Sequence, residues 1–186
     1  MPVFKRESSN KMYSPTAYFW GRITSNALAQ VFYPINCVLI VFWGLSIDTS
    51  LNNFAMFILY AVLTNFEAIA LGFFLGSLMK DVQAAAVTLT LFQLLFMLTS
   101  GGLGNVDSFP TVIKWVSYAN PQRYACQGIF FRLTEHVEPP EVRDQVRDAL
   151  GYSEFSDEYC LSLIAILMGV FLLGGWLNIV IENWNH

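Results

Sequence analysis

Apolar residues gather into four long runs along the chain, separated by short polar breaks. The runs cover roughly 15–45, 53–79, 82–100 and 159–181. A helix rises about 1.5 Å per residue, so about 20 apolar residues are enough to cross the ~30 Å hydrocarbon core of a bilayer. The pattern therefore predicts an all-α membrane protein with about four transmembrane helices.

The same pattern divides the chain into four parts. Residues 1–14 are a polar loop, 15–100 hold the first three predicted helices, and 159–186 hold the last helix with a short tail. Residues 101–158 differ from both helical parts, because no apolar run among them is long enough to span a bilayer. We expect this third part to be a small subdomain on the far side of the membrane.

Two features inside residues 101–158 predict its local structure. Two short half-apolar stretches meet at Asn120-Pro121, which favours a re-entrant helical hairpin over residues 110–133. Further on, apolar residues recur at Val142 and Val146 before Gly151, the pattern of a short amphipathic helix that ends at a glycine.

The first apolar run carries its own start signal and an internal break. Ser14 followed by Pro15 is typical of a helix N-cap with proline at the first helical position. Pro34 lies inside the run, where proline removes one backbone hydrogen bond and kinks a helix. Cys37, in the same run, is expected to be a small core residue.

The second run carries small residues at a helical spacing. Ala68, Gly72 and Gly76 recur every four residues, a pattern that lets a neighbouring helix approach closely. Leucine at Gly72 or Gly76 is therefore expected to disturb packing more than leucine at Phe73. Only Lys80-Asp81 separates this run from the next, so the two helices must be antiparallel neighbours.

Basic residues indicate the orientation of the chain. Lysine and arginine gather before and at the start of the first helix and recur at Lys80, whereas residues 46–52 contain neither. Because cytoplasmic loops are enriched in lysine and arginine, the N-terminus and Lys80 are predicted to be cytoplasmic. Four spans then place the C-terminus in the cytoplasm and residues 101–158 outside.

Composition narrows the function classes. Hydrophobic residues make up 55 % of the chain and charged residues 13 %, while the net charge of −4 gives no reason to expect a nucleic-acid partner. His136 and His186 are far apart and are read as solvated surface residues, and no metal-ligand spacing occurs. Cys126 and Cys160 would both lie outside, where a disulfide is possible, but their spacing leaves this open.

Several motifs in order resemble one transporter family. The most specific is W-x-x-Y-x-x-P-x-R-Y over residues 115–124, and others lie at 3–7, 12–19, 72–76 and 100–105. Together they resemble the C-terminal part of the transmembrane domain of G-subfamily ABC transporters of the white/brown type, an ABC-2 type membrane domain. On this resemblance, the four predicted helices correspond to family helices three to six.

The resemblance also shows what this sequence does not contain. Family helices one and two are absent, and so is the nucleotide-binding domain, because no glycine is followed by lysine as the phosphate-binding motif G-x-x-x-x-G-K-[ST] requires. The chain is therefore expected to be no enzyme and to bind no cofactor itself. A separate or missing nucleotide-binding domain would bind ATP.

The resemblance further implies a substrate path and a coupling segment. In the helix 82–100, the implied path residues share one helical face, which either lines the substrate path or simply packs against other helices; they are Thr90, Gln93, Leu94 and Met97. Leu103 falls where the family closes the path on its outer side. Glu67 at membrane depth is either part of this path or an interhelical hydrogen-bonding residue. Phe4, Arg6 and Glu7 would contact the nucleotide-binding domain.

Two functions from different classes fit these expectations. The first is the membrane-domain portion of an ABC exporter of lipids, sterols or amphipathic small molecules. It would form part of the translocation path in a homo- or heterodimer with another transporter half. The second is a reduced family member that serves as a non-transporting structural subunit of a larger membrane complex. In both, membrane lipid surrounds the chain.

Overall fold

The computed structural model describes residues 15–45, 50–79, 81–102, 104–134, 140–152 and 155–184. Within them lie seven α-helices and one short 3₁₀ helix, and no strand. In chain order, the elements are α2 (Pro15–Leu45), α3 (Leu51–Leu78), α4 (Val82–Thr99), η1 (Val106–Ser108), α5 (Thr111–Tyr118), α6 (Pro121–Thr134), α7 (Pro140–Leu150) and α8 (Asp157–Trp184).

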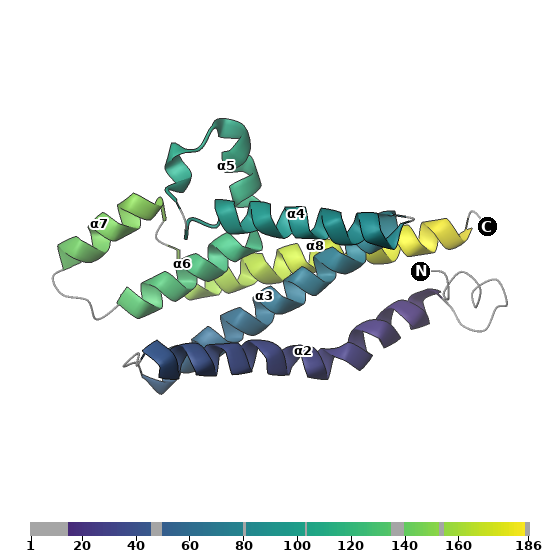
Figure 1. Cartoon of the computed structure of the whole chain (residues 1–186), viewed down its shortest axis with the longest axis horizontal. Helices are drawn as coiled ribbons and strands as arrows, with labels where there is room; N and C mark the ends of the chain where they lie inside the picture. The colour runs from purple at the N-terminus through teal and green to yellow at the C-terminus, as the bar shows by residue number, and fades with distance from the viewer. Residues whose placement is uncertain are drawn as a thin grey trace.

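Four of these helices are long and apolar enough to cross a membrane, which confirms the expected fold class. The candidate spans are Trp20–Leu45, Leu51–Leu78, Val82–Thr99 and Asp157–Ile181. The beginning of α2 and the end of α8 lie at the same end of the bundle (Figure 1), as an even number of spans requires. Which end faces the cytoplasm stays a prediction.

Polar caps determine where two of the spans begin. Ser50 precedes α3, and its hydroxyl oxygen accepts a hydrogen bond from the backbone N–H of Asn53 at 3.3 Å. Asp81 precedes α4, and its carboxylate accepts from the backbone N–H groups of Gln83 and Ala84. Each cap satisfies donors that the first turn of a helix leaves free.

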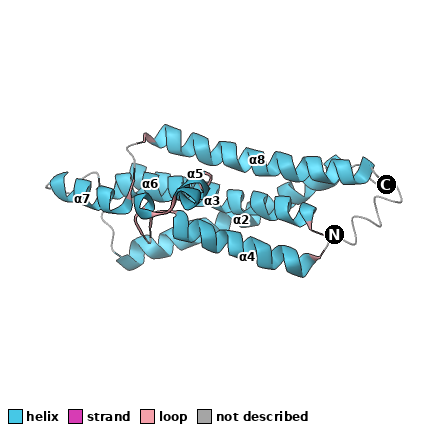
Figure 2. Cartoon of the chain, turned by 90° about the horizontal axis from the view of Figure 1, so that it is seen from above, coloured by secondary structure: helices cyan, strands magenta, loops and turns pink. Residues whose placement is uncertain are grey.

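Helix α3 is the centre of the bundle. It contacts α2, α4, α6 and α8, and its most extensive contact is with α8. Viewed from above, α4 and α8 lie on opposite sides of α3 (Figure 2). The core accordingly forms around α3, where Tyr60 packs with Tyr124, Cys160 and Ile164, and Leu71 packs with Phe96.

Glycines of α8, rather than those of α3, allow the close approach between these two helices. A Cβ atom added at Gly175 would lie 3.3 Å from the backbone N and Cα of Phe74, and one at Gly174 would lie 2.9 Å from the Phe74 ring. A Cβ at Gly72 would make only an ordinary 3.5 Å contact, and one at Gly76 would meet nothing within 4 Å. The expectation that Gly72 and Gly76 form the close-approach face is therefore wrong within this chain. The repeat was real, but α8 approaches α3 with its own glycines.

The short helices α5 and α6 meet at Asn120 and pack at one end of the bundle. Helix α6 contacts α3, α4 and α8, and α5 contacts the end of α4. Both lie away from the end where α2 begins and α8 ends, and α7 lies further out (Figure 1). Whether the hairpin enters the membrane stays a prediction.

Residues after α7 attach this outer part to the bundle. Gly151 follows α7 with a positive φ of 70°, and Tyr152 then turns inward and is buried. The Tyr152 ring packs edge-on against Phe130 of α6 at 5.5 Å and covers Gly101, where any Cβ would overlap the ring. Gly101 also has a φ of 88°, so both space and backbone conformation require glycine there.

The expectation that Cys37 is a core residue is wrong, because its side chain is exposed on α2. Helix α2 touches the bundle along one side only, where Pro34 and Phe42 are buried. Cys37 lies on the side that the chain's own helices leave uncovered. All three cysteines, including Cys126 and Cys160, are free thiols in the structure.

Candidate functional site

Three of the predicted path residues lie together on the uncovered face of α4. Leu94 and Met97 are 51 % and 52 % exposed, and Thr90 is also exposed. The Thr90 hydroxyl donates to the Ala86 carbonyl oxygen at 2.9 Å, so its hydrogen bond as a donor is made within α4. Thr90, Leu94 and Met97 are named the α4 face below. No helix within the described part of the chain covers it.

Gln93 is set apart from the α4 face by its partner. Its side-chain oxygen accepts a hydrogen bond from Nε2 of Gln122 at 2.6 Å, which draws it toward the start of α6. Gln93 therefore joins α4 to the hairpin instead of standing with the other three residues. Its amide nitrogen is buried without a hydrogen-bond partner among the described residues.

Glu67 is fully buried on α3, between the two core clusters around Tyr60 and Leu71. Neither carboxyl oxygen has a hydrogen-bond partner among the described residues. The interhelical hydrogen bond that was one expectation for this residue is therefore not formed here. The remaining predicted residues, Leu103 and the coupling residues Phe4, Arg6 and Glu7, lie outside the described residues, as do His136 and His186.

Asn120 connects the hairpin to α4. It is fully buried, and its Nδ2 donates to the Phe96 carbonyl oxygen at 2.6 Å and to Oγ1 of Thr99 at 3.1 Å. Its Oδ1 accepts from the backbone N–H of Gln122 at 2.9 Å and so caps α6. One side chain thus both starts α6 and fixes it to the end of α4.

The neighbouring motif residues strengthen this attachment. The Ser117 hydroxyl donates to the Thr99 carbonyl oxygen at 3.0 Å and accepts from Nη1 of Arg123 at 3.0 Å. The Arg123 guanidinium also stacks 4.8 Å from the ring centre of Tyr118. These residues and Asn120 are named the hairpin cluster. The W-x-x-Y-x-x-P-x-R-Y stretch is therefore a structural joint in this fold.

Tyr124 closes the hairpin from the other side. Its hydroxyl donates to the Tyr118 carbonyl oxygen at 2.8 Å, which links α6 back to the last residue of α5. Burial raises the pKa of the Tyr124 hydroxyl above its usual value. A tyrosine hydroxyl is already neutral at neutral pH, and burial keeps it a neutral donor further into the alkaline range.

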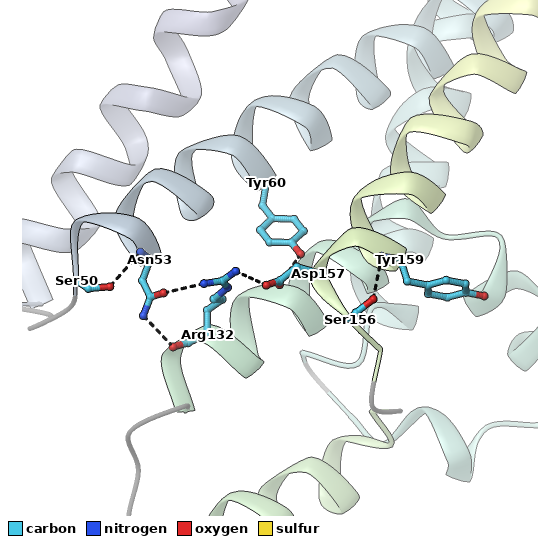
Figure 3. Close-up of polar contacts among 7 residues, drawn as sticks. All are labelled: Ser50, Asn53, Tyr60, Arg132, Ser156, Asp157 and Tyr159. Carbon is cyan, nitrogen blue, oxygen red and sulfur yellow. Dashed lines mark hydrogen bonds and ion pairs between the residues drawn. The ribbon is translucent and has the colours of Figure 1, made fainter.

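A second polar cluster joins three helices where α6 ends and α8 begins (Figure 3). Arg132 at the end of α6 forms an ion pair with Asp157 at the start of α8, and its Nη1 donates to Oδ1 of Asn53 on α3 at 3.2 Å. The Tyr60 hydroxyl donates to Asp157 at 3.1 Å. We name these four residues the ion-pair cluster.

Sequence reasoning missed the ion-pair cluster, although one signal was available. A basic residue in the last turn of α6 and an acidic residue in the first turn of α8 both interact favourably with the dipole of their own helix. The helix-dipole preference explains why each charged residue lies at its helix end, but it does not predict that the two residues pair with each other. Among the described residues, no group of three or more His, Cys, Asp or Glu residues could hold a metal ion.

These features define the class of protein: a multi-pass helical membrane protein, whose polar side chains tie helices together. The family described as ABC-2 type transporter matches residues 1–131, more than two thirds of the chain. The chain belongs to this family, and the expected resemblance is confirmed.

Individual relatives agree with the family. The chain is 25 % identical over 186 residues to the ABC transporter ATP-binding protein/permease wht-3 of Caenorhabditis elegans, covering 98 % of this chain and 30 % of the relative. It is 26 % identical over 187 residues to Protein scarlet of Drosophila melanogaster, covering 93 % and 28 %. ABC transporter G family member 21 of Arabidopsis thaliana is 24 % identical over 123 residues, covering 66 % and 18 %. The chain thus spans less than a third of each of these relatives.

Proposed function

We propose that the chain is the membrane-domain portion of an ABC exporter of lipids, sterols or amphipathic small molecules, and that it works in a dimer. The observation that carries this proposal is the α4 face, which none of the other described helices covers. Because the chain belongs to a transporter family, we infer that this exposed face lines part of the translocation path. A second transporter half, identical or different, would complete the path across from it.

The chemistry of the α4 face suits an amphipathic cargo. It combines two long, flexible apolar side chains with one hydroxyl whose proton is already donated within the helix. Sites that bind such molecules are mainly apolar with few polar groups. In the proposal, Gln93, Glu67 and Leu103 contribute polar and closing groups along the same path.

Energy for transport would come from outside the described residues. ABC-type nucleotide binding needs a glycine-rich loop whose N–H groups surround phosphate, with a lysine on the β- and γ-phosphates. In the proposal, a nucleotide-binding domain on a separate chain or a further segment docks near Phe4, Arg6 and Glu7. Movement there would pass into α2, which begins at Pro15, eight positions after Glu7.

The purified 186-residue chain in lipid vesicles is expected to bind no ATP. When combined with a partner that carries a nucleotide-binding domain, it is expected to export a fluorescent lipid. Because Leu94 and Met97 are exposed, L94A and M97A should leave the melting temperature nearly unchanged and alter export several-fold. I166A is the matched control, since Ile166 of α8 is 59 % exposed on another helix.

Each outcome separates the proposals. Specific ATP binding by the chain alone would contradict the expected dependence on another domain. Equal export by L94A, M97A and I166A would remove the α4 face from the path. Stable assembly with partners but no export under any condition would favour the structural-subunit function.

We also propose that both termini are cytoplasmic. In a variant whose native cysteines are replaced by serine, Glu141→Cys should react with a membrane-impermeant maleimide added outside sealed cells. Ser8→Cys should react only after the cells are permeabilised. The reverse pattern, or labelling of both positions in intact cells, would overturn this topology.

A further inference from the structure

Pro34 leaves one carbonyl of α2 without its usual partner. It lies inside the helix, and because proline has no N–H, the Gln30 carbonyl four residues earlier lacks the hydrogen bond that position 34 would otherwise donate. In a membrane helix, such a freed group needs a donor from elsewhere. Figure 1 shows α2 changing direction between its first turns and the long stretch beside α3.

Asn65 of the neighbouring helix supplies that donor. Its Nδ2 donates to the Gln30 carbonyl oxygen at 2.8 Å and lies 3.4 Å from the Gln30 side-chain oxygen. Asn65 is half-buried on α3, and Pro34 is buried. The side-chain amide therefore replaces, from another helix, the N–H that Pro34 lacks.

Two further contacts hold α2 on either side of this point. Toward its start, the Trp176 indole N–H of α8 donates to the Thr16 hydroxyl at 3.3 Å. Toward its end, the Phe42 ring packs edge-on against Phe54 and Phe57 of α3, at 5.1 and 4.8 Å. The hydrogen bond from Asn65 thus lies along α2 between these two contacts, at the carbonyl that Pro34 leaves free.

We propose that Pro34 and Asn65 form a clamped hinge in α2. With the hydrogen bond made, the two halves of α2 keep one angle, and movement at the start of the helix passes to its outer half. With the bond broken, the angle between the halves varies more, because Pro34 already removes one of the backbone hydrogen bonds that cross that point. As a coupling device, the hinge rests on the proposed function, since α2 follows the proposed coupling segment.

The hinge is tested by a double-mutant cycle that needs no transport. Spin labels at Ser25 and Ile40, two exposed positions on either side of Pro34, report the distance across the bend in the full chain in nanodiscs. The native cysteines are replaced by serine in every variant. Asn65→Leu removes the donor, and Pro34→Ala restores an N–H for the Gln30 carbonyl.

We expect N65L alone to broaden the distance distribution and to lower the melting temperature by about 2–4 °C, the scale of one lost interhelical hydrogen bond. P34A should lengthen and narrow the distribution. In the P34A background, N65L should broaden nothing, because the carbonyl is then satisfied within α2. Equal broadening by N65L in both backgrounds, or none in either, would overturn the hinge.

An export assay then separates the hinge from the proposed function. If N65L slows export while P34A/N65L does not, the hinge acts in coupling. If the spin-label cycle behaves as expected but no export occurs with any partner, the hinge stands and the proposed function fails. If export occurs and N65L leaves its rate unchanged, the coupling role is overturned.

Discussion

Replacing Gly128 by alanine should strongly destabilise the bundle, although alanine is the better helix former. A Cβ atom at Gly128 would overlap the hydroxyl and Cζ of Tyr60 and lie 2.9 Å from its Cε1. The Tyr60 ring has nowhere to move, because it is fully buried and its hydroxyl donates to Asp157. Overpacking of this kind costs about 1–3 kcal/mol.

Moving Tyr60 would also break its hydrogen bond to Asp157, and bonds to charged groups contribute about 1.5–3 kcal/mol. We therefore expect G128A to lose roughly 3 kcal/mol in total, or about 6–12 °C in the melting temperature in detergent. The matched control is G169A in α8, where an added Cβ meets nothing within 4 Å. There, alanine should be neutral or gain up to about 1 kcal/mol.

A second variant identifies the cause. Y60F removes the hydroxyl that the new Cβ would overlap, so G128A should cost less in the Y60F background than in the natural chain. Equal melting temperatures for G128A and G169A would show that Tyr60 can move aside. Strictly additive losses for G128A and Y60F would show that the two residues do not compete for the same space.

The long helices were predictable because lipid imposes a simple requirement. About 20 apolar residues are needed to span, and every backbone group must be satisfied within the segment, so hydropathy alone locates α2, α3, α4 and α8. The start of α3 was less clear. The apolar run suggested Asn53, whereas the cap at Ser50 begins the helix at Leu51, because a cap is a local hydrogen bond that hydropathy does not register.

The tertiary contacts were not predictable from composition or spacing. Asn53 and Arg132 are 79 residues apart, and nothing in either segment indicates the other. The glycines of α3 showed that its backbone could be approached but not by which helix, and α8 instead brings Gly175 against Phe74. Helical periodicity did place Thr90, Leu94 and Met97 on one face. Only the partner Gln122 shows why Gln93 turns away from them.

At Pro34, the sequence predicts the local effect on the helix but not the residue of the neighbouring helix that compensates for it. A kink in α2 follows from proline chemistry and was expected from the sequence. The donor that satisfies the freed carbonyl could have been any polar residue at a similar depth, including Thr64 on the preceding position of α3. The structure instead shows Thr64 donating to the Tyr60 carbonyl oxygen in its own helix, which leaves Asn65 for Gln30.

Replacing Asn120 by leucine should detach the hairpin from α4. The change removes two donated hydrogen bonds and one accepted bond at a fully buried position. Loss of the N-cap alone costs about 1 kcal/mol, and each buried group left without a partner costs about 1–3 kcal/mol more. We expect a total loss of roughly 3 kcal/mol or more, and faster hydrogen exchange in α5 and α6 than in α8.

Two comparisons test that explanation. Asn120→Ser can still cap α6 but cannot reach the Phe96 carbonyl, so its loss should be smaller than that of Asn120→Leu. The loss that Asn120→Ser still shows measures the link to α4, and the difference between the two variants measures the cap. Asn36→Leu is the matched control, because Asn36 is exposed and donates only to the Phe32 carbonyl of its own helix at 2.9 Å. That change should stay within about 0.5 kcal/mol. If Asn120→Ser were as damaging as Asn120→Leu, the cap would contribute nothing. If it were harmless, α6 would stay attached without the Asn120 amide, and Ser117 with Arg123 would be the joint that holds it.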